Sequence, residues 1–254
     1  MKWSLVAAAI LVMILVLVAA VPNARELSPR VTPIALKNIS GMAWDGEKLW
    51  ITVDGEGAIY RVDAASGSIE RRLPFPSRET AGSAWDGKAL WQISYKARTI
   101  SRVDPASGKI TAVIATPGNG GCSGMTYDGR HLWIANYDTE LIYAVDPRNG
   151  KIVGQIAGNG HATGLAWDAG RLWTGFVLPS NSPAATPRIG FVQEIDVRSQ
   201  LPIRAIPIAG VFAGTSDATP ASPRATRMWW YDGYHERVVE IRLGRGHRLS
   251  PRGS

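Results

Sequence analysis

Short segments in which apolar and polar residues alternate follow one another along most of this chain, separated by stretches rich in Gly, Asp, Pro and Ser. Between residues 124 and 158, four such segments are joined by three turns. A period of two is typical of half-buried β-strands, and no segment beyond an N-terminal apolar run has a convincing helical period. The pattern therefore predicts an all-β protein.

The segment at residues 124–158 is the best-matched copy of a repeat. Each copy opens with a glycine, which is followed by Trp or Tyr, by Asp-Gly or Asp-Ala, and then by Leu-Trp. The leading glycines are 41, 42 and 40 residues apart, and a fifth, degenerate copy has Met-Trp at residues 228–229. Such a period indicates a repeat architecture. The glycines are Gly41, Gly82, Gly124 and Gly164, and the tryptophans are Trp50, Trp91, Trp133 and Trp173.

Turn chemistry explains many of the repeated residues. We letter the four strands of a copy a to d in chain order. Asp-Gly between strands a and b supplies the positive φ of a tight hairpin, and Asp-Pro-x-Ser/Asn-Gly between c and d fits a type I turn that ends on a left-handed glycine. Gln200 replaces this glycine in the fourth copy, so we expect an altered turn there. Insertions are expected at residues 178–188 and 219–226.

Four antiparallel strands in each of five repeats predict a single-domain, five-bladed β-propeller at residues 31–243. The fifth copy lacks a strand d, and residues 31–38 have the alternation to supply it, so this N-terminal strand is expected to close the last blade. Closure would remove the free sheet edges of the ring. Residues 244–254 would then form a basic, flexible tail. The blades are expected at residues 41–76, 82–117, 124–158, 164–209 and 212–243.

The first 24 residues have the features of an export segment. Lys2 precedes an apolar run at residues 5–21, which is the arrangement of a signal peptide, and cleavage after Ala20 or Ala24 is favoured. The run has about 17 residues, close to the minimum that spans a bilayer, so retention as a membrane anchor is the alternative. We therefore expect a secreted or periplasmic protein that touches the membrane only through this segment, if it is retained.

Composition removes several classes of function. Lys and Arg number 28 against 21 Asp and Glu, but the excess is scattered except near residues 242–252. Because no basic stripe is interleaved with aromatic residues, nucleic acid is not an expected partner. The single cysteine, Cys122, excludes a disulfide within the chain, and no Cys/His spacing suggests zinc. We predict no metal site, and the sequence indicates no particular cofactor.

The pattern G-x-A-W-D-G-x-x-L-W … I-Y-R-V-D-P-x-S-G-K resembles the repeats of exported bacterial propellers over residues 31–243. These include glutamine cyclotransferase-like, YVTN-repeat and gluconolactonase-like proteins. For the cyclotransferases the resemblance implies five blades and the formation of N-terminal pyroglutamate. It also implies a Gln-Gly or Glu-Gly pair at the start of strand a and a Glu-Ser-Thr-Gly run in a strand b. Here the corresponding segments are Ser40-Gly41, Ala81-Gly82, Ser123-Gly124 and Thr163-Gly164, and Ile-Thr-Val-Asp at residues 51–54.

Candidate functional residues are those that break the repeat. In a propeller, the b–c and d–a loops emerge on one face, where unrepeated polar side chains converge on a rigid scaffold. Catalysis there would need an acid or a base, and the candidates are Glu79, Asp138, Glu140 and His161. His161 suits a general base or a metal ligand, although a hydrogen bond to a neighbouring loop is the simpler interpretation. The predicted ligand-binding residues are Asp54, Tyr95, Lys96, Asn136, Tyr137, Asp138 and His161.

The repeated residues are interpreted as structural. Turn chemistry explains the Asp residues of the a–b turns better than calcium binding does, and packing between blades explains the Trp residues better than sugar stacking does. Cys122 follows two glycines and is expected to be a small buried residue rather than a nucleophile. Likewise, His235 and Glu236 are interpreted as surface loop residues, because adjacent strand residues point to opposite faces.

These features predict an exported binding module that recognises a small molecule, a glycan or a protein segment on the face formed by the b–c and d–a loops. The alternative is an enzyme of propeller type, either a glutaminyl-peptide cyclotransferase-like acyltransferase or a lactone or ester hydrolase. A structural role with an envelope protein partner is a third hypothesis, which an exposed apolar patch on one face would favour.

Overall fold

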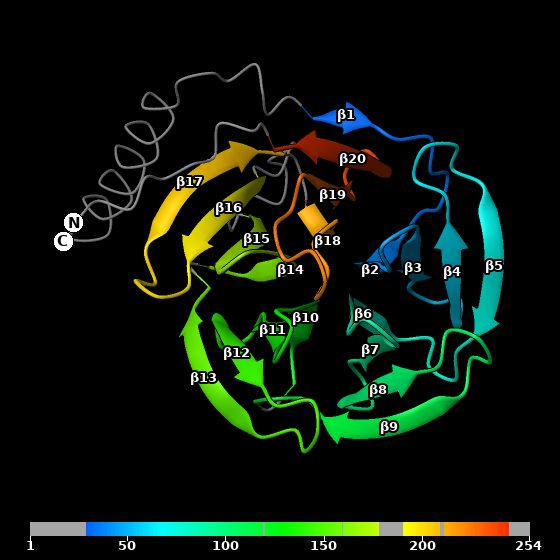
Figure 1. The fold of residues 1–254 in the computed structure, drawn as a ribbon, viewed down its shortest axis with the longest axis horizontal. Helices are drawn as coiled ribbons and strands as arrows, with labels where there is room; N and C mark the ends of the chain where they lie inside the picture. Colours follow the sequence, from blue (N-terminus) through cyan, green and yellow to red (C-terminus); the bar gives the residue numbers. More distant parts are fainter. Residues whose placement is uncertain (1–28, 119, 159, 178–189, 209–210, 244–254) are drawn as a thin grey trace, which may run out of the picture.

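Five four-stranded antiparallel sheets stand around a central channel in the computed structural model, which describes residues 29–118, 120–158, 160–177, 190–208 and 211–243 (Figure 1). The predicted five-bladed, all-β propeller is thereby confirmed. In each of the first four blades, consecutive strands run in order from the channel to the rim.

The bounds of the strands follow the repeat. Blade 1 contains β2 (Ile39–Trp44), β3 (Leu49–Val53), β4 (Ala58–Val62) and β5 (Ile69–Pro74). Blade 2 contains β6 (Thr80–Trp85), β7 (Leu90–Ser94), β8 (Thr99–Val103) and β9 (Ile110–Ala115). Blade 3 contains β10 (Cys122–Tyr127), β11 (Leu132–Asn136), β12 (Leu141–Val145) and β13 (Ile152–Ala157). Blade 4 contains β14 (Ala162–Asp168), β15 (Arg171–Val177), β16 (Gly190–Asp196) and β17 (Pro202–Pro207). Blade 5 contains β18 (Val211–Ser216), β19 (Arg227–Asp232), β20 (Arg237–Arg242) and β1 (Arg30–Val31).

The N-terminal strand closes the ring as predicted, but it is shorter than residues 31–38. β1 pairs antiparallel with β20, and Thr32 adds one more backbone hydrogen bond to that strand. Pro33 follows and has no N–H to donate, so the ladder ends there. Ile34 is buried and packs with the core of blade 1 instead.

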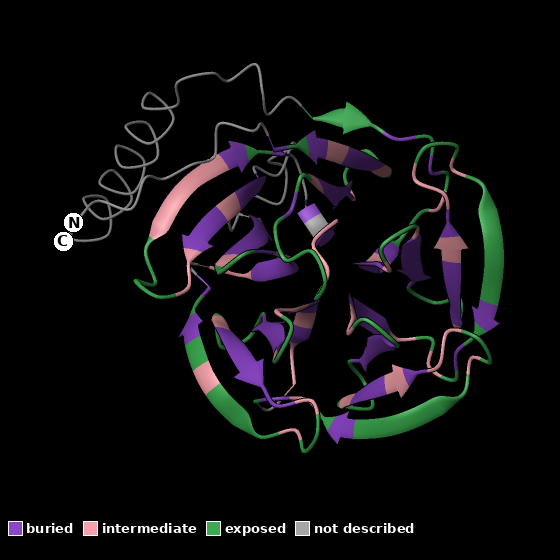
Figure 2. Ribbon diagram, viewed as in Figure 1, coloured by how far each residue is buried: buried purple, intermediate pink, exposed green. Residues whose placement is uncertain are grey.

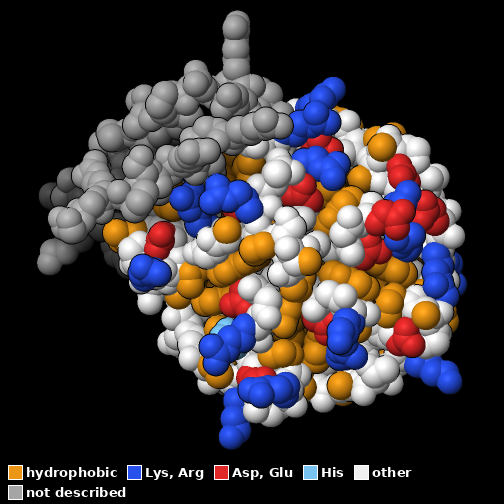
Figure 3. Space-filling model, viewed as in Figure 1, with side chains coloured by type: hydrophobic (Ala, Val, Ile, Leu, Met, Phe, Trp, Pro, Cys, Tyr) orange, Lys and Arg blue, Asp and Glu red, His pale blue; other side chains and the backbone are white. Residues whose placement is uncertain are grey.

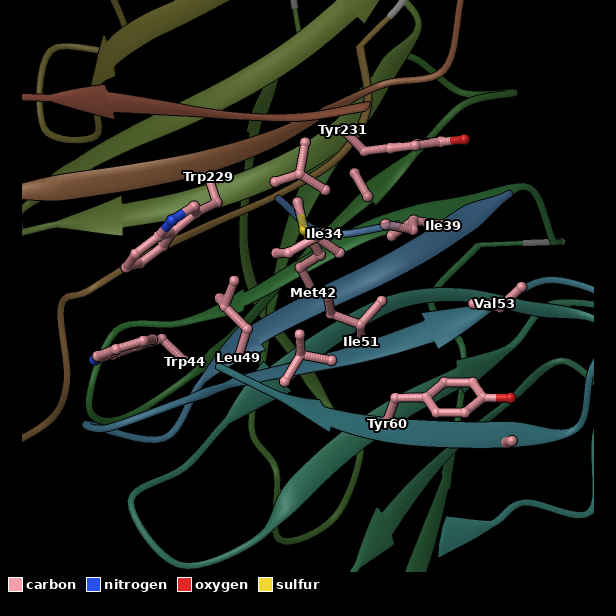
Figure 4. Close-up of a cluster of buried hydrophobic side chains, with 14 residues drawn as sticks. Ile34, Ile39, Met42, Trp44, Leu49, Ile51, Val53, Tyr60, Trp229 and Tyr231 are labelled. Atoms are coloured by element: carbon pink, nitrogen blue, oxygen red, sulfur yellow. The ribbon is translucent and has the colours of Figure 1, made fainter. Parts of the chain in front are cut away.

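Large side chains fill the spaces between neighbouring blades. Figure 4 shows this between blades 5 and 1, where alternate residues of β2, β3, β4 and β19 point into one cluster. The rings of Trp44 and Trp229 stack there with centroids 4.9 Å apart. Figure 2 shows that the inner strands are mostly buried, whereas much of the exposed surface belongs to the outermost strands. The burial of Trp50, Trp91, Trp133, Trp173 and Trp229 agrees with their interpretation as packing residues.

In blades 1 to 3, the Asp residue of the a–b turn binds the indole N–H of the strand b tryptophan. Asp45 accepts hydrogen bonds from two backbone N–H groups of its own turn through Oδ1. Its Oδ2 accepts from the indole N–H of Trp50 and from Nε of Arg61, both at 2.9 Å. Asp86 repeats the arrangement in blade 2, and Asp128 keeps the bond to the indole in blade 3. These carboxylates therefore serve the scaffold.

The expectation of an altered c–d turn in blade 4 is wrong. Gln200 takes a φ of 59°, close to the 75° of Gly67 in blade 1. Its N–H donates to the carbonyl oxygen of Asp196 at 2.7 Å, just as Gly67 donates to Asp63 at 2.8 Å. The flanking strands fix the turn, and Gln200 accepts a left-handed conformation that costs a residue with a Cβ about 1–2 kcal/mol.

The loop between β18 and β19 crosses the ring in Figure 1 and covers one end of the channel. Pro223 accepts a hydrogen bond from Ala169 N–H at 2.8 Å, and Ala225 N–H donates to Asp168 Oδ1 at 2.9 Å. Figure 3 shows the same side, with apolar side chains near the middle and basic side chains distributed around the rim. The loop thus ties blade 5 to blade 4 on the side opposite the b–c loops.

The predicted export segment at residues 1–24, the insertion at residues 178–188 and the tail at residues 244–254 lie outside the described residues. Within the described ranges, no helix is both long enough and apolar enough to cross a membrane.

Candidate ligand-binding site

The innermost strand of every blade begins with an irregularity in its pairing with the next strand. An extra residue at such a bulge re-aims side chains, and here it falls at the mouth of the channel. Ser40, Ser123 and Thr163 lie at these positions, which immediately precede the leading glycines. The register shifts occur at residues 39–41, 80–83, 122–125, 162–164 and 211–213.

Hydroxyl groups line the mouth at these bulges, and their hydrogen bonds join neighbouring blades. Ser40 Oγ lies 2.8 Å from Thr80 Oγ1, which links blade 1 to blade 2. Ser123 Oγ donates to the carbonyl oxygen of Ala162 at 2.5 Å, which links blade 3 to blade 4. Thr163 Oγ1 donates to two backbone carbonyls.

The leading glycines allow the inner strands to approach one another closely. A Cβ on Gly82 would lie 2.3 Å from the backbone nitrogen of Met125 in the neighbouring blade. Contacts also extend across the ring, because β10 contacts both β2 and β18. The channel is therefore narrow below its mouth.

A buried polar network lies between blades 1 and 2 below the mouth. Ser83 Oγ lies 2.6 Å from Gln92 Oε1 and 3.3 Å from Thr52 Oγ1, and the side-chain amide of Gln92 donates to the carbonyl oxygen of Ala81 at 2.8 Å. Thr52, Ser83 and Gln92 are all buried. The network consists of neutral groups, with Thr52 and Gln92 on strands b and Ser83 on a strand a.

The four described b–c connections share a four-residue turn, which spans residues 54–57, 95–98, 137–140 and 233–236. Each turn ends on a residue with a positive φ, namely Gly57, Arg98, Glu140 and Glu236. The first residue of each turn lies at the mouth of the channel, and these residues are Asp54, Tyr95, Tyr137 and Gly233. One local geometry therefore brings the first residue of each of these turns to the same space.

The space they enclose is a pocket of about 530 Å³, to which all five blades contribute. This volume lies within the range of small-molecule sites. The pocket has tyrosine rings and carboxylates at its walls and hydroxyl groups at its base, and among the described residues no Lys, Arg or His side chain lines it. The polar side chains in the lining are Asn38, Ser40, Asp54, Thr80, Tyr95, Ser123, Tyr137, Asp138, Thr163 and Tyr231.

The structure brings together four of the predicted ligand-binding residues, Asp54, Tyr95, Tyr137 and Asp138, in this pocket. Asp54 Oδ1 accepts a hydrogen bond from the N–H of Thr80 at 3.1 Å. Burial raises the pKa of Tyr95, and the negative charge of Asp54 adds to the shift.

The other three predicted ligand-binding residues lie beside the pocket. Asn136 is fully buried, and its Oδ1 accepts the N–H groups of Asp138 and Thr139, so it holds the b–c turn in place. His161 stacks on the ring of Tyr137 with centroids 4.2 Å apart, and its Nδ1 lies 3.0 Å from the carbonyl oxygen of Tyr137. Lys96 lies in a separate groove outside the mouth.

The catalytic candidates do not form one acid–base group. Only Asp138 lines the pocket. Glu140 Oε1 lies 3.7 Å from His161 Nδ1, and Glu79 Oε1 lies 3.3 Å from the ammonium of Lys96. The backbone N–H of Glu79 and the Lys96 ammonium hold the pKa of the Glu79 carboxyl below its usual value, which does not suit a proton donor.

Tyr231 and the hydroxyl groups at the base are lining residues that the sequence did not single out. Tyr231 is buried, and its hydroxyl oxygen accepts the N–H of Asn38 at 2.9 Å. Burial raises the pKa of this phenol. One signal was present in the sequence, because the residue before the leading glycine carries a hydroxyl group at Ser40, Ser123 and Thr163.

Cys122 lines the pocket, but its thiol is unreactive at neutral pH. The residue is buried, and its thiol lies 3.5 Å from the carbonyl oxygen of Pro117. Burial raises the pKa of this thiol to about 12, with a smaller contribution from the charge of Asp138. At neutral pH it is therefore not the thiolate that nucleophilic catalysis requires.

A histidine–carboxylate pair lies in the b–c turn of blade 5. His235 Nδ1 lies 2.6 Å from Oδ2 of the buried Asp232, and Arg237 Nε lies 3.2 Å from the same oxygen. His235 is a surface loop residue that partners Asp232 rather than Glu236. In the part of the chain that the structure describes, no group of three or more His, Cys, Asp or Glu side chains is placed to hold a metal ion.

No protein-family model matches this sequence, and no curated protein does. Glutaminyl cyclase from Myxococcus xanthus is a solved structure with a TM-score of 0.64; it is 14% identical and covers 85% of this chain and 97% of its own. The chain is similar to glutaminyl cyclase in fold. A chain of the nidogen/laminin complex matches with a TM-score of 0.53 and 18% identity, over 82% of this chain and 76% of that one. The resemblance to cyclotransferase-like propellers is thus confirmed for the fold.

Proposed function

We propose that this protein is an exported propeller that binds a small molecule, a glycan or a protein segment in the pocket at the mouth of its channel. The observation that carries this proposal is the pocket of about 530 Å³, in which residues from four b–c turns meet the bulged starts of the inner strands. The scaffold is the same in every blade, whereas the first residue of the b–c turn is Asp54 in blade 1, Tyr in blades 2 and 3, and Gly233 in blade 5. Such variation on a rigid frame is typical of ligand recognition.

Binding is favoured over catalysis because the described lining holds no acid–base pair. The thiol of Cys122 has a pKa of about 12, and the hydroxyl groups of Ser123 and Thr163 donate to backbone carbonyls. The carboxylates of Asp54 and Asp138 are exposed and line the pocket. Ionised carboxylates accept hydrogen bonds and attract positive charge, which serves binding directly.

The alternative is a cyclotransferase-like acyltransferase or a lactone or ester hydrolase of propeller type. The likeness of the fold to glutaminyl cyclase favours it, together with the position of Asp138 in the pocket. A peptide with N-terminal Gln is the discriminating substrate. If the wild-type protein forms pyroglutamate from this peptide and Asp138→Asn abolishes the activity, the enzymatic proposal replaces the binding proposal.

A variant that fills the pocket tests binding. Gly233→Tyr places in blade 5 the residue that blades 2 and 3 carry at the same point of the b–c turn, and Gly233 has no positive φ. Ala97→Tyr is the matched control, because Ala97 lies in a b–c turn but lines the separate outer groove. Ligand-observed NMR with a library of neutral, anionic and cationic fragments, oligosaccharides and short peptides gives the readout.

We expect at least one class of compound to bind the wild-type protein and Ala97→Tyr but not Gly233→Tyr. If no compound distinguishes the two variants, the pocket is not a binding site. Export is a separate part of the proposal and rests on residues 1–24 alone; N-terminal sequencing of protein recovered from the medium and the envelope tests both export and cleavage.

A further inference from the structure

Asp54 and Asp138 differ from most acidic side chains of this protein. Although the chain carries a net charge of +7, neither carboxylate forms an ion pair within the described residues. Elsewhere, basic side chains neutralise acids: Glu194, for example, meets Arg171 and Arg204 at 2.6 Å each. Among the described residues, the two pocket carboxylates therefore have no ion-pair partner.

The backbone makes room for one of these carboxylates. Gly121 has a φ of 70°, and a Cβ at this position would lie 2.3 Å from Asp138 Oδ2. Asp138 thus rests against a bare backbone at the edge of the pocket. Of the basic side chains around the mouth, Lys96 lies 3.3 Å from Glu79 Oε1, and Arg78 donates to the carbonyl oxygen of Gly55 at 3.1 Å.

Three tyrosines complete the walls of the pocket. Tyr95 and Tyr137 begin b–c turns, and Tyr231 extends from β19 past the hydrophobic cluster, where Figure 4 shows its hydroxyl group pointing away from Trp229. Only 3% of Tyr231 is exposed, and its oxygen accepts the N–H of Asn38. Within the described residues its own O–H has no acceptor, so it can donate to a ligand.

We propose that the pocket binds an organic cation, namely an ammonium group carried on an apolar or aromatic body. This inference rests on the proposed function of the pocket. Asp54 and Asp138 would neutralise the ammonium group, and the faces of the tyrosine rings attract cations and cover apolar surface. The hydroxyl groups at the base and Tyr231 would meet polar atoms of the body. An anion would face two uncompensated carboxylates, and the described lining offers it no basic side chain.

Isothermal titration calorimetry at low ionic strength, with the full protein, tests the charge preference. The probes are 2-phenylethylammonium, the isosteric neutral 2-phenylethanol and the anion 3-phenylpropanoate, and calcium chloride is the inorganic control. We expect the ammonium to bind at least about tenfold more tightly than the alcohol, the anion to bind more weakly still, and added salt to weaken only the ammonium.

Charge-removing variants locate the effect. Asp54→Asn and Asp138→Asn are each expected to weaken 2-phenylethylammonium at least about tenfold and to leave 2-phenylethanol unchanged. Glu56→Gln is the matched control, because Glu56 lies two residues from Asp54 in the same turn but bonds to the hydroxyl group of Tyr60 and does not line the pocket. Equal melting temperatures would show that the variants are folded.

The outcomes separate this inference from the proposed function. If the alcohol or the anion binds as tightly as the ammonium, or if neither Asp variant weakens the ammonium, the organic-cation inference is overturned. Tight calcium binding that depends on both Asp residues would also overturn it, in favour of an inorganic ion. A dipeptide amide that outcompetes 2-phenylethylammonium would assign the ammonium to a peptide N-terminus. The proposed function itself fails on different results: if no fragment distinguishes Gly233→Tyr from Ala97→Tyr, or if the protein forms pyroglutamate and Asp138→Asn abolishes that activity.

Discussion

The narrow waist of the channel gives a quantitative prediction for Gly82→Ala. A Cβ at this position would lie 2.3 Å from Met125 N and 2.5 Å from the carbonyl carbon of Gly124, whereas ordinary contacts begin at 3.4 Å. The obstruction is backbone of the next blade, which cannot rotate away as a side chain would. The inner strands of blades 2 and 3 must therefore separate by about 1 Å, against the close packing of a closed ring.

Overpacking of this kind costs about 1–3 kcal/mol, and the rigid neighbour places Gly82→Ala at the upper end, about 3 kcal/mol. For a domain of this size, such a loss lowers Tm by about 6–12 °C. Gly154→Ala in β13 is the matched control, because the nearest atom to its new Cβ is Ala144 Cβ at 3.8 Å. That variant is expected to gain about 0.4–1 kcal/mol, since alanine restricts the unfolded chain.

Thermal unfolding followed by circular dichroism, together with urea titration followed by tryptophan fluorescence, measures both variants. Gly82 lies in β6 of blade 2 and Gly154 in β13 of blade 3; because both are strand residues, the difference between the variants separates packing between blades from strand propensity. A Gly82→Ala protein whose Tm lies within 2 °C of that of Gly154→Ala would refute the close approach of β6 and β10.

Three further predictions concern the scaffold and the pocket. Gln200→Gly removes the backbone strain of a residue with a Cβ in the left-handed conformation, and it is expected to raise the free energy of unfolding by up to about 1 kcal/mol. An unchanged urea midpoint would contradict this strain. Burial alone would raise the pKa of Asp86, but hydrogen bonds from Arg102 and from its own turn outweigh burial and lower this pKa. The ionised carboxylate therefore stabilises the folded protein above about pH 4, and this stabilisation is lost as the pH falls through the depressed pKa. Asp86→Asn should therefore lower the free energy of unfolding by about 1–3 kcal/mol at pH 7. The difference in stability from the wild-type protein should disappear in acid, and a difference that stays constant with pH would refute this prediction. Iodoacetamide at pH 8 should leave Cys122 unmodified in the folded protein and label it in urea, as mass spectrometry would show; rapid labelling of the native protein would contradict a pKa of about 12.

The candidate site shows where local pattern stops being informative. Asp54, Tyr95, Tyr137 and Asp138 could be selected from the sequence because they depart from the repeat in loops that emerge on one face. The same reasoning also selected Lys96, which follows Tyr95 directly but lies in the outer groove. Only the tertiary structure shows that the second residue of this turn leaves the pocket in blade 2, at Lys96, but lines it in blade 3, at Asp138.

Asn136 and Tyr231 are two further residues whose roles could not be predicted from the local sequence pattern. Asn136 reads as a polar loop residue, yet its amide is fully buried, holding its own turn. Tyr231 reads as one more aromatic residue of a strand, yet its hydroxyl group reaches the pocket and binds the backbone before β2. Both assignments depend on contacts between segments far apart in the chain.

The sequence by itself determined the number of blades, the strands within each blade and the ring closure by the N-terminal strand. It could do so because turn residues and alternating side chains act locally and recur five times. It misjudged the length of the closing strand, which ends early at Pro33, and the turn at Gln200. Tertiary structure alone decided how close the inner strands approach, which loop residues share one pocket, and that Asp54 and Asp138 stand there without ion pairs. These features depend on distances between blades, which no single repeat encodes.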